Sequence, residues 1–279
     1  MKRAVTLASS YHPDKEVRQF MYERFKDCAP KEFLALNRSD GSQLVFEPDS
    51  PELQEALALA RQFNLDFKLF NEVYYSKQEL DRLPFFYVPL SDPLAVEYKH
   101  PTDYGTKYRI CPHCNFPLQR EGDLLVNGTL LRKRDIGRLD QEVFVSEEMR
   151  QLIEEAQLTG LEFRPEIKEY RGRLMPPYYV AEVKKTLPPV SISTWLAPHK
   201  SYNCEHNILY LRSDLQYETG KLDNANDFNL TFERFNNYRE RYLVVSQRAR
   251  QVLRKHGIHL YYYPVTLLDD TLQITYLSK

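Results

Sequence analysis

Two cysteines separated by two residues are the clearest chemical feature of the sequence. They lie in the stretch Lys107-Tyr-Arg-Ile-Cys111-Pro-His-Cys114-Asn-Phe-Pro117. A Cys-x-x-Cys turn directs both thiolates toward one point, which suits half of a metal site or a redox couple. A metal site needs further ligands elsewhere in the chain, whereas a redox couple needs a group that lowers a thiol pKa.

The second half of a metal site is predicted in Asn203-Cys204-Glu-His206-Asn207. Structural zinc prefers four cysteine or histidine ligands arranged as a tetrahedron. The predicted ligands of one structural Zn²⁺ ion are Cys111, Cys114, Cys204 and His206. His113 and His199 are alternatives to His206 as the fourth ligand.

A thiol–disulfide oxidoreductase that uses Cys-Pro-His-Cys is a further interpretation of the first stretch. In such enzymes the first cysteine caps a helix, and the helix dipole lowers the pKa of its thiol. Here Asn115-Phe-Pro117 follows, and a helix is not expected to begin through that proline. The sequence therefore favours a metal site over a redox couple.

Composition limits the class of protein. The chain has 279 residues, of which 42% are hydrophobic and 28% charged, values typical of a folded soluble protein. A formal net charge of −1 gives no overall attraction to nucleic acid or to an anionic membrane. No apolar run approaches the roughly 20 residues of a membrane helix, and no signal-peptide apolar region is recognisable. We expect a cytoplasmic protein, in which four cysteines indicate metal or thiols rather than disulfides.

An internal repeat organises the C-terminal part of the chain. Residues 143–156 and 243–256 each begin with a short apolar run that ends at a serine, Ser146 or Ser246. Apolar residues then recur at i, i+3, i+4 and i+7, the spacing of one helix face, and serine is a preferred N-cap. Each predicted helix is followed by a strand that ends at a proline, over residues 161–165 and 260–264.

The N-terminal part resembles a third, degenerate copy of this pattern. An apolar run at 44–46 is followed by Ser50, an amphipathic helix and a strand at 65–69, although any serine-capped helix between strands has this form. A helix is also predicted at 14–25. Further strands are predicted at 32–36, at Phe85–Val88 with Pro89 and Leu90 as an edge strand, and at Tyr178–Val183.

These patterns predict an α+β fold of repeated strand–helix–strand units, with a zinc-knuckle site between two C-terminal halves. The predicted regions are an N-terminal α/β region, a first knuckle with its unit and a second knuckle with its unit, at residues 1–100, 101–170 and 171–279.

Two knuckles that each precede a unit of the form VS…R…L(I/L)…G(L/I) resemble the double-CxxCG-motif proteins of bacteria, over roughly residues 105–266. That family includes immunity proteins, which neutralise secreted toxins of sibling cells. The chain departs from the motif at Asn115, where the family has glycine, and at Cys204-Glu-His206, where it has a second Cys-x-x-Cys. The resemblance implies a zinc-stabilised binding protein without catalysis.

The expected function is therefore that of a non-enzymatic immunity protein or antitoxin that binds a partner toxin directly. Asp223, Asp227, Glu233 and Glu240 could form an acidic patch suited to a basic toxin, but three arginines interrupt it, at 234, 239 and 241. The sequence carries no Walker loop, dinucleotide fingerprint or zinc-deaminase pattern, which agrees with a protein that is not an enzyme.

A nucleic-acid-binding zinc module is the alternative function. The basic run at 132–134 lies near Tyr104, Tyr108 and Phe116, and zinc knuckles with basic and aromatic neighbours can bind single strands. Asp135, which follows the basic run at once, and the slightly acidic chain favour a solvated loop instead.

Overall fold

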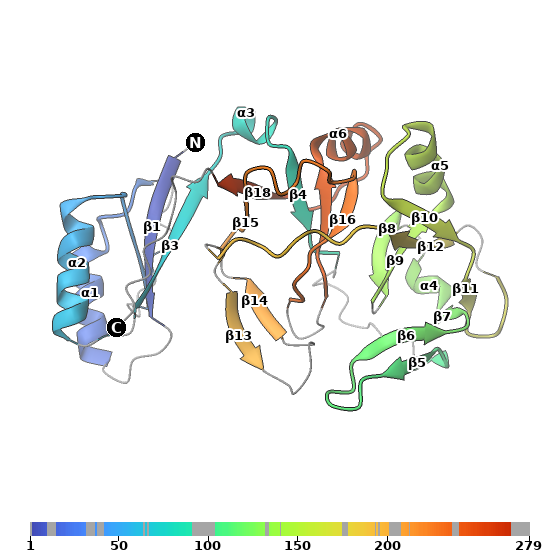
Figure 1. The fold of residues 1–279 in the computed structure, drawn as a ribbon, viewed down its shortest axis with the longest axis horizontal. Coiled ribbons are helices and arrows are strands. Elements are labelled where there is room, and N and C mark those ends of the chain that lie inside the picture. Colours follow the sequence, from blue (N-terminus) through green and yellow to red (C-terminus); the bar gives the residue numbers. More distant parts are fainter. Residues whose placement is uncertain are drawn as a thin grey trace.

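The structure is a computed structural model. It describes residues 2–9, 15–31, 37, 42–63, 65, 67–90, 104–131, 134–139, 141–174, 178–192, 194, 196–200, 208–211, 213–235 and 240–268. The structure contains both helices and strands, so the predicted α+β class is confirmed (Figure 1). Within the part that the structure describes, no helix combines the length and apolar composition needed to span a membrane.

The N-terminal unit is a three-stranded antiparallel sheet with helices on one face (Figure 1). Its central strand β1 (Lys2–Ser9) lies between β2 (Gln43–Phe46) and β3 (Phe67–Tyr74). Helices α1 (Lys15–Phe25) and α2 (Pro51–Gln62) bury their apolar faces against this sheet. Both predicted helices are thereby confirmed, whereas the strand predicted at 32–36 lies outside the described residues.

A second sheet forms the first C-terminal half. Its strands are β8 (Ile136–Leu139), β9 (Glu142–Ser146), β10 (Leu161–Arg164) and β12 (Tyr178–Val183), in the antiparallel order β10-β12-β9-β8. Helix α5 (Glu147–Glu155) connects β9 to β10. The other face of the sheet packs on β7 (Leu124–Val126), α4 (Gly128–Leu131) and β11 (Ile167–Glu169). The strands predicted near 161–165 and at 178–183 are confirmed.

A third sheet forms the second C-terminal half, in the order β15-β18-β4-β17-β16. Its strands are β4 (Phe85–Val88), β15 (Leu215–Glu218), β16 (Phe228–Leu230), β17 (Leu243–Ser246) and β18 (Tyr263–Leu268). The short helix α3 (Lys77–Leu80) precedes β4, and α6 (Gln247–Lys255) follows β17.

Two details of this third sheet differ from the sequence prediction. Strand β4 was predicted at an edge, but it lies between β17 and β18, because Pro89 falls just beyond the strand and removes no ladder hydrogen bond. The strand predicted at 260–264 begins later, at Tyr263, and continues through Pro264. It continues because β18 changes partner there, from β4 to β15 at Val265.

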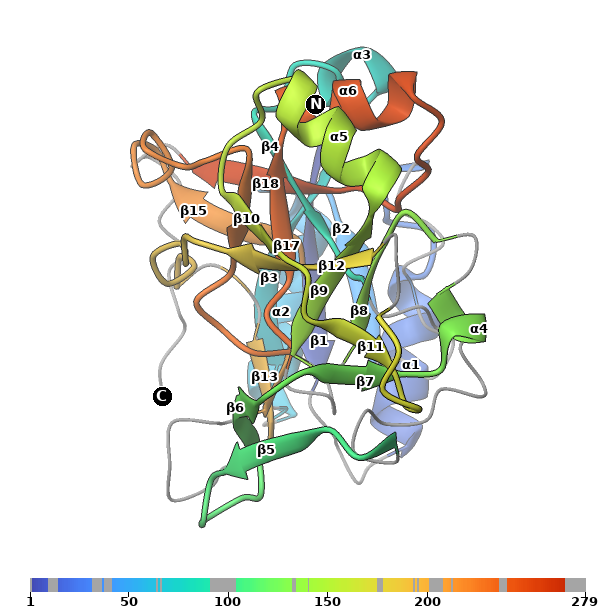
Figure 2. The same cartoon turned by 90° about the vertical axis from the view of Figure 1, so that its right-hand side faces the viewer.

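Two hairpins extend from the side of the molecule opposite α5 and α6 (Figures 1 and 2). The first pairs β5 (Lys107–Ile110) with β6 (Pro117–Glu121), and the second pairs β13 (Leu196–Lys200) with β14 (Ile208–Leu211). The predicted cysteine turn therefore connects β5 to β6. Residues 201–207, which include Cys204 and His206, connect β13 to β14 and lie outside the described residues.

Helices α5 and α6 lie beside each other and share one apolar core (Figures 1 and 2). Met149 and Ile153 of α5 belong to the same buried cluster as Ala249 and Leu253 of α6. Residues of both C-terminal sheets, such as Val145 and Val245, complete this cluster. The core therefore crosses the sequence boundary predicted at residue 170.

Serine caps begin three helices in the same way. The hydroxyls of Ser50, Ser146 and Ser246 accept hydrogen bonds from the N–H groups of Leu53, Met149 and Ala249, at 3.2, 3.2 and 3.0 Å. Each cap satisfies one donor that the first helical turn leaves without an intrahelical partner. The serine caps predicted for the repeat are confirmed.

The same helices also end alike. The N–H groups of Leu65, Leu158 and Ile258 donate to the carbonyls of Ala60, Ile153 and Leu253, at 2.9, 3.0 and 3.0 Å. This six-residue return is the Schellman ending, which usually brings an apolar residue back onto the helix. All three returning side chains are buried.

Asp227 fastens the end of α5 to the beginning of α6. Its carboxylate accepts from the cap hydroxyl of Ser246 at 2.5 Å, and from the N–H and hydroxyl of Thr159 at 2.9 and 3.2 Å. At the start of α5, Ser146 and Asp135 form the corresponding contact at 3.4 Å. Because Asp227 and Glu240 are buried, the acidic surface patch predicted from four carboxylates is wrong.

Replacing Ser246 with alanine should destabilise the protein more than replacing Ser146. Each change removes an N-cap worth about 1 kcal/mol, but S246A also deprives the buried Asp227 carboxylate of its closest donor, for a total of about 2 kcal/mol. Urea unfolding measures both changes. Ser76→Ala, at the cap of the four-residue α3, is the control and should cost least. Equal losses for S146A and S246A would contradict the role given to Asp227.

Candidate metal centre

The cysteine turn is closed by its own backbone. The N–H of Cys111 donates to the carbonyl of Phe116 at 2.8 Å, and the N–H of Asn115 donates to the carbonyl of Cys111 at 2.8 Å. Asn115 has a φ of 55°, a left-handed conformation that asparagine tolerates better than most residues. Asparagine therefore occupies the glycine position of the family motif without opening the turn.

The two thiols of this turn differ in exposure. Cys111 is 4% exposed, whereas Cys114 is partly exposed, and neither forms a disulfide. A turn that brings two cysteines together at the tip of a hairpin has the form of half a structural zinc site. Whether these two cysteines bind an ion stays a prediction.

The remaining candidate ligands lie in different parts of the chain. Cys204 and His206 lie outside the described residues, His199 belongs to β13, and His113 is exposed in the cysteine turn. Among the residues that the structure describes, no three cysteine, histidine or carboxylate side chains form a group that could hold a metal ion. The four-ligand set therefore stays a prediction.

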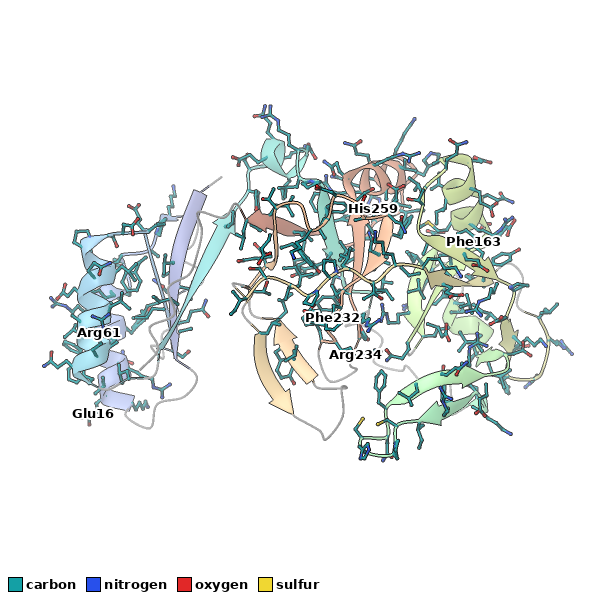
Figure 3. The ribbon with its side chains drawn as sticks, viewed as in Figure 1. Glu16, Arg61, Phe163, Phe232, Arg234 and His259 are labelled. Carbon is teal, nitrogen blue, oxygen red and sulfur yellow. The ribbon has the colours of Figure 1, made fainter. Side chains whose placement is uncertain are left out.

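Arg234 connects the two hairpins. Its guanidinium carbon lies 4.5 Å from the centroid of the Phe116 ring, in the cysteine turn. The backbone carbonyl of Arg234 accepts from the N–H of Leu209 in β14 at 3.3 Å, and its side chain donates to Gln141 at 3.0 Å. Figure 3 shows Arg234 between the second half and the β5–β6 hairpin. A single residue thus contacts the cysteine turn and the strand that follows the second predicted ligand pair.

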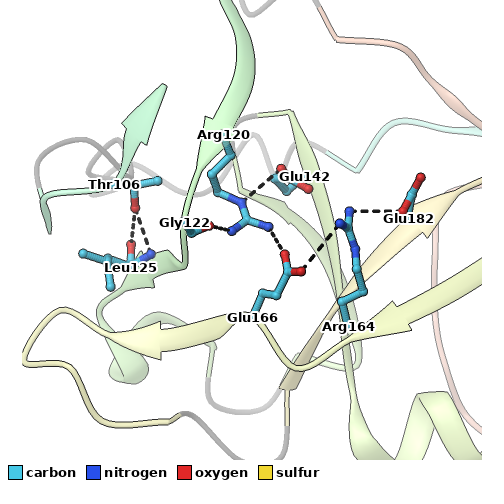
Figure 4. A network of polar contacts seen from close by, with 8 residues as sticks. All are labelled: Thr106, Arg120, Gly122, Leu125, Glu142, Arg164, Glu166 and Glu182. Atoms are coloured by element: carbon cyan, nitrogen blue, oxygen red, sulfur yellow. Dashed lines mark hydrogen bonds and ion pairs between the residues drawn. The ribbon is translucent and has the colours of Figure 1, made fainter. Parts of the chain in front are cut away.

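Arg120 anchors the first hairpin to the sheet (Figure 4). Its side chain is only 5% exposed and pairs with Glu142, at 3.2 Å, and with Glu166. It also donates to the carbonyl of Gly122. Burial lowers the pKa of Arg120, but the hydrogen bonds and charges of Glu166 and Glu142 outweigh burial and raise that pKa overall. The hairpin that carries the cysteine turn is therefore held by a charged network.

An open pocket of about 490 Å³ lies over this network. It is lined by polar and apolar groups of the hairpin, including Tyr108 and Leu118, and by Arg164, which extends the network to Glu182 at 3.1 Å (Figure 4). The carboxylates and guanidinium groups pair with one another across the pocket floor. Sequence reasoning missed this network, because its members come from four strands, β6, β9, β10 and β12, and from the turn between β10 and β11.

The second hairpin is attached by apolar packing instead, because Leu196, Leu209 and Leu211 pack against the buried cluster that includes Tyr87, Tyr242 and Phe235. The rings of Tyr263, Tyr87, Tyr242 and Phe235 form a continuous stack, with successive centroids 5.0, 5.4 and 4.5 Å apart. Asp214 lies beside this stack, just before β15, and burial raises its pKa to about 7. Burial also raises the pKa of Tyr87, and the Asp214 charge adds to that effect. The sequence gives no signal that separates Asp214 from exposed aspartates.

A scan against protein-family models found no match for this chain, and a search of curated proteins found no relative.

Substituting Arg120 with methionine should loosen the β5–β6 hairpin. The substitution leaves Glu142 and Glu166 without their buried partner, and because both carboxylates are partly exposed the cost should be about 1–3 kcal/mol. Hydrogen exchange of residues 107–121 measures the local effect. The control is Arg164→Met, at a side chain that is 39% exposed, and it should have less effect. Unchanged exchange in the hairpin of R120M would exclude the anchoring role.

Asp214 should make the protein less stable as pH rises. Its pKa is about 3.9 in an unfolded chain and about 7 in the folded protein, so between these values the folded protein binds more protons. Stability is then fully present below pH 4 and falls until about pH 7. D214N should match the wild type near pH 4 and exceed it at pH 8, by at most about 4 kcal/mol.

Thermal unfolding at both pH values measures this difference. Asp123→Asn provides the matched control, since Asp123 precedes β7 as Asp214 precedes β15, but pairs with Lys168 at 2.7 Å. The control should not gain stability at pH 8. A D214N variant less stable than wild type at that pH would refute the assignment.

Proposed function

We propose that this chain is a non-enzymatic, zinc-stabilised binding protein of the immunity-protein type, which neutralises a protein toxin by direct contact. The observation that carries the proposal is the closed Cys111–Cys114 turn, joined through Arg234 to β14 of the second hairpin. In this proposal Cys111, Cys114, Cys204 and His206 hold one structural Zn²⁺ ion. The ion joins the two halves at the end opposite the α5–α6 core.

Equivalent strand pairings support a duplication behind the two halves. In each half a hairpin with cysteine between its strands precedes a strand, β7 or β15, that pairs in parallel with a strand following the helix. An antiparallel pair, β8–β9 or β16–β17, then leads into the serine-capped helix. Two copies of one zinc-knuckle unit, each giving two ligands to a shared ion, account for this order.

The N-terminal unit fits the same scheme as a third copy without a knuckle. It shares the serine cap of α2, the Schellman ending at Leu65 and a helix between two strands that flank a central one. A three-residue insertion, 47–49, separates β2 from the cap serine of its helix. This copy has diverged further than the two C-terminal halves.

The alternatives have less support from the site. A nucleic-acid module would use aromatic rings as stacking surfaces, but Phe116 is 3% exposed and its face is covered by Arg234. A thiol oxidoreductase would use a helix N-terminus to lower the pKa of its first cysteine. Cys111 instead follows β5 and lies in a turn between two strands. Both observations favour a structural metal site.

The metal content of purified protein tests the zinc site. We expect one zinc ion per chain, near-complete loss of zinc in C111S and C204S, and a melting temperature lowered by about 5 °C or more, because structural zinc contributes directly to folding free energy. Cys28→Ser is the matched control, because Cys28 packs against the N-terminal core. The C28S protein should keep its zinc. Elemental analysis showing unchanged zinc in C111S would remove the site.

The binding function is tested separately with a toxin encoded beside this gene. Purified protein and toxin should form a stable complex in gel filtration. Co-expression of this protein should restore the growth of cells that produce the toxin. If the protein lowered the activity of the toxin but formed no complex with it at micromolar concentration, neutralisation by direct binding would be contradicted.

A further inference from the structure

The N-terminal unit shows how one complete copy of the fold is arranged. Its first strand, β1, lies between β2, which precedes the serine-capped helix α2, and β3, which follows that helix. All three strands belong to one continuous segment. The central position of the sheet is thus filled by the first strand of the same unit.

The two C-terminal halves fill that central position differently. Strand β4 precedes the first hairpin, yet it lies between β17 and β18 of the second half. Strand β12 precedes the second hairpin, yet it lies between β9 and β10 of the first half. Each central strand comes from the segment that begins the other half.

The two central strands occupy their sheets in the same register. Phe85 of β4 is opposite the cap Ser246, and Tyr178 of β12 is opposite the cap Ser146. Three further pairs follow in each ladder, ending at Val88 with Leu243 and at Ala181 with Val143. Proline precedes both strands in the sequence, at positions 84 and 177. Equal register and equal partners identify β4 and β12 as equivalent strands.

We propose that β4 and β12 are exchanged between the two C-terminal halves, so that each half completes the sheet of the other and neither is an autonomous domain. Their side chains are deeply buried in the receiving sheets: Phe86 and Val88 are each 1% exposed, and Val180 is 0% exposed. Without its donated strand, each sheet has two unpaired edges in its centre. The surface between β17 and β18 is therefore an interaction site for β4, and the surface between β9 and β10 is one for β12.

Further backbone contacts join the segments next to the exchanged strands. After β12, Leu187 donates to the carbonyl of Leu230 in β16 at 2.8 Å, and Leu230 donates to Lys185 at 2.8 Å. The N–H of Phe228 donates to the carbonyl of Thr159 at 3.0 Å. Gly160, with a φ of +102°, leaves no room for a Cβ, which would overlap the carbonyl oxygen of Phe228. These contacts hold the two halves in one register.

A cut between the halves tests the exchange. A protease site can be inserted after Gly172, in an exposed loop where an added Cβ would meet nothing within 4 Å. The full-length chain then folds before it is cleaved. After cleavage, residues 1–172 retain β4 and residues 173–279 retain β12. We expect the two pieces to elute as one 1:1 complex at micromolar concentration, with excess chelator present so that a shared zinc ion cannot account for their association.

Refolding and amide hydrogen exchange then distinguish strand exchange from simple docking of two folded domains. After denaturation the pieces should refold only together, at a rate that depends on their concentration. In the cleaved complex, Val88→Ala should raise exchange at least tenfold in β17 and β18 of the other piece, with β9 and β10 unchanged. Val180→Ala is the reciprocal variant, in β12, and should raise amide hydrogen exchange in β9 and β10 instead.

Three results would overturn the proposal. The first is separation of the cleaved pieces under native conditions, and the second is cooperative refolding of either piece alone. The third is a rise in amide hydrogen exchange in the sheet of the piece that carries the substitution. Because the measurement is made with chelator, its outcome does not depend on whether the zinc site of the proposed function exists.

Discussion

The apolar layer between α5 and α6 holds the two C-terminal halves together, and the other features of this region depend on it. Each helix has only one strongly apolar face, and that face is too small to enclose a core against one sheet alone. Burying both faces in one cluster with strands of both sheets removes both from water at once. The loop after α5 then meets the beginning of α6, which is where Asp227 forms its hydrogen bonds to Thr159 and Ser246.

Opposite this layer, two hairpins with the same position in the fold are attached by different chemistry. The first is held by the charged pairs around Arg120, and the second by leucines that pack on the buried cluster containing the stacked rings of Tyr87 and Tyr242. A buried charged network requires each partner to be present, whereas stacked rings lose only contact area when one is trimmed. The hairpin with the Cys-x-x-Cys turn thus has the attachment more sensitive to single substitutions. Zinc at the hairpin tips would add a second connection between halves already joined by α5 and α6.

The exchange of central strands explains why the helix layer and the hairpins stay in register. A strand that enters the opposite sheet fixes both its hydrogen-bond ladder and the face on which its side chains lie, since a shift of one residue would turn them to the other face. With β4 and β12 both fixed in this way, the two sheets cannot slide past one another.

The sequence by itself determined the local elements. Ser146 and Ser246 start their helices where the apolar spacing predicted, and the strand at Tyr178–Val183 forms as expected, because capping and amphipathic periodicity act within a few residues. Only the tertiary structure decided that β4 is central, that β18 passes through Pro264, and that Asp227 is buried between two helices. Each of these depends on at least one partner about 70 to 180 residues away in the chain. No local pattern records such partners, because an aspartate or a short apolar strand looks the same in sequence whether it is exposed at an edge or enclosed by another part of the molecule.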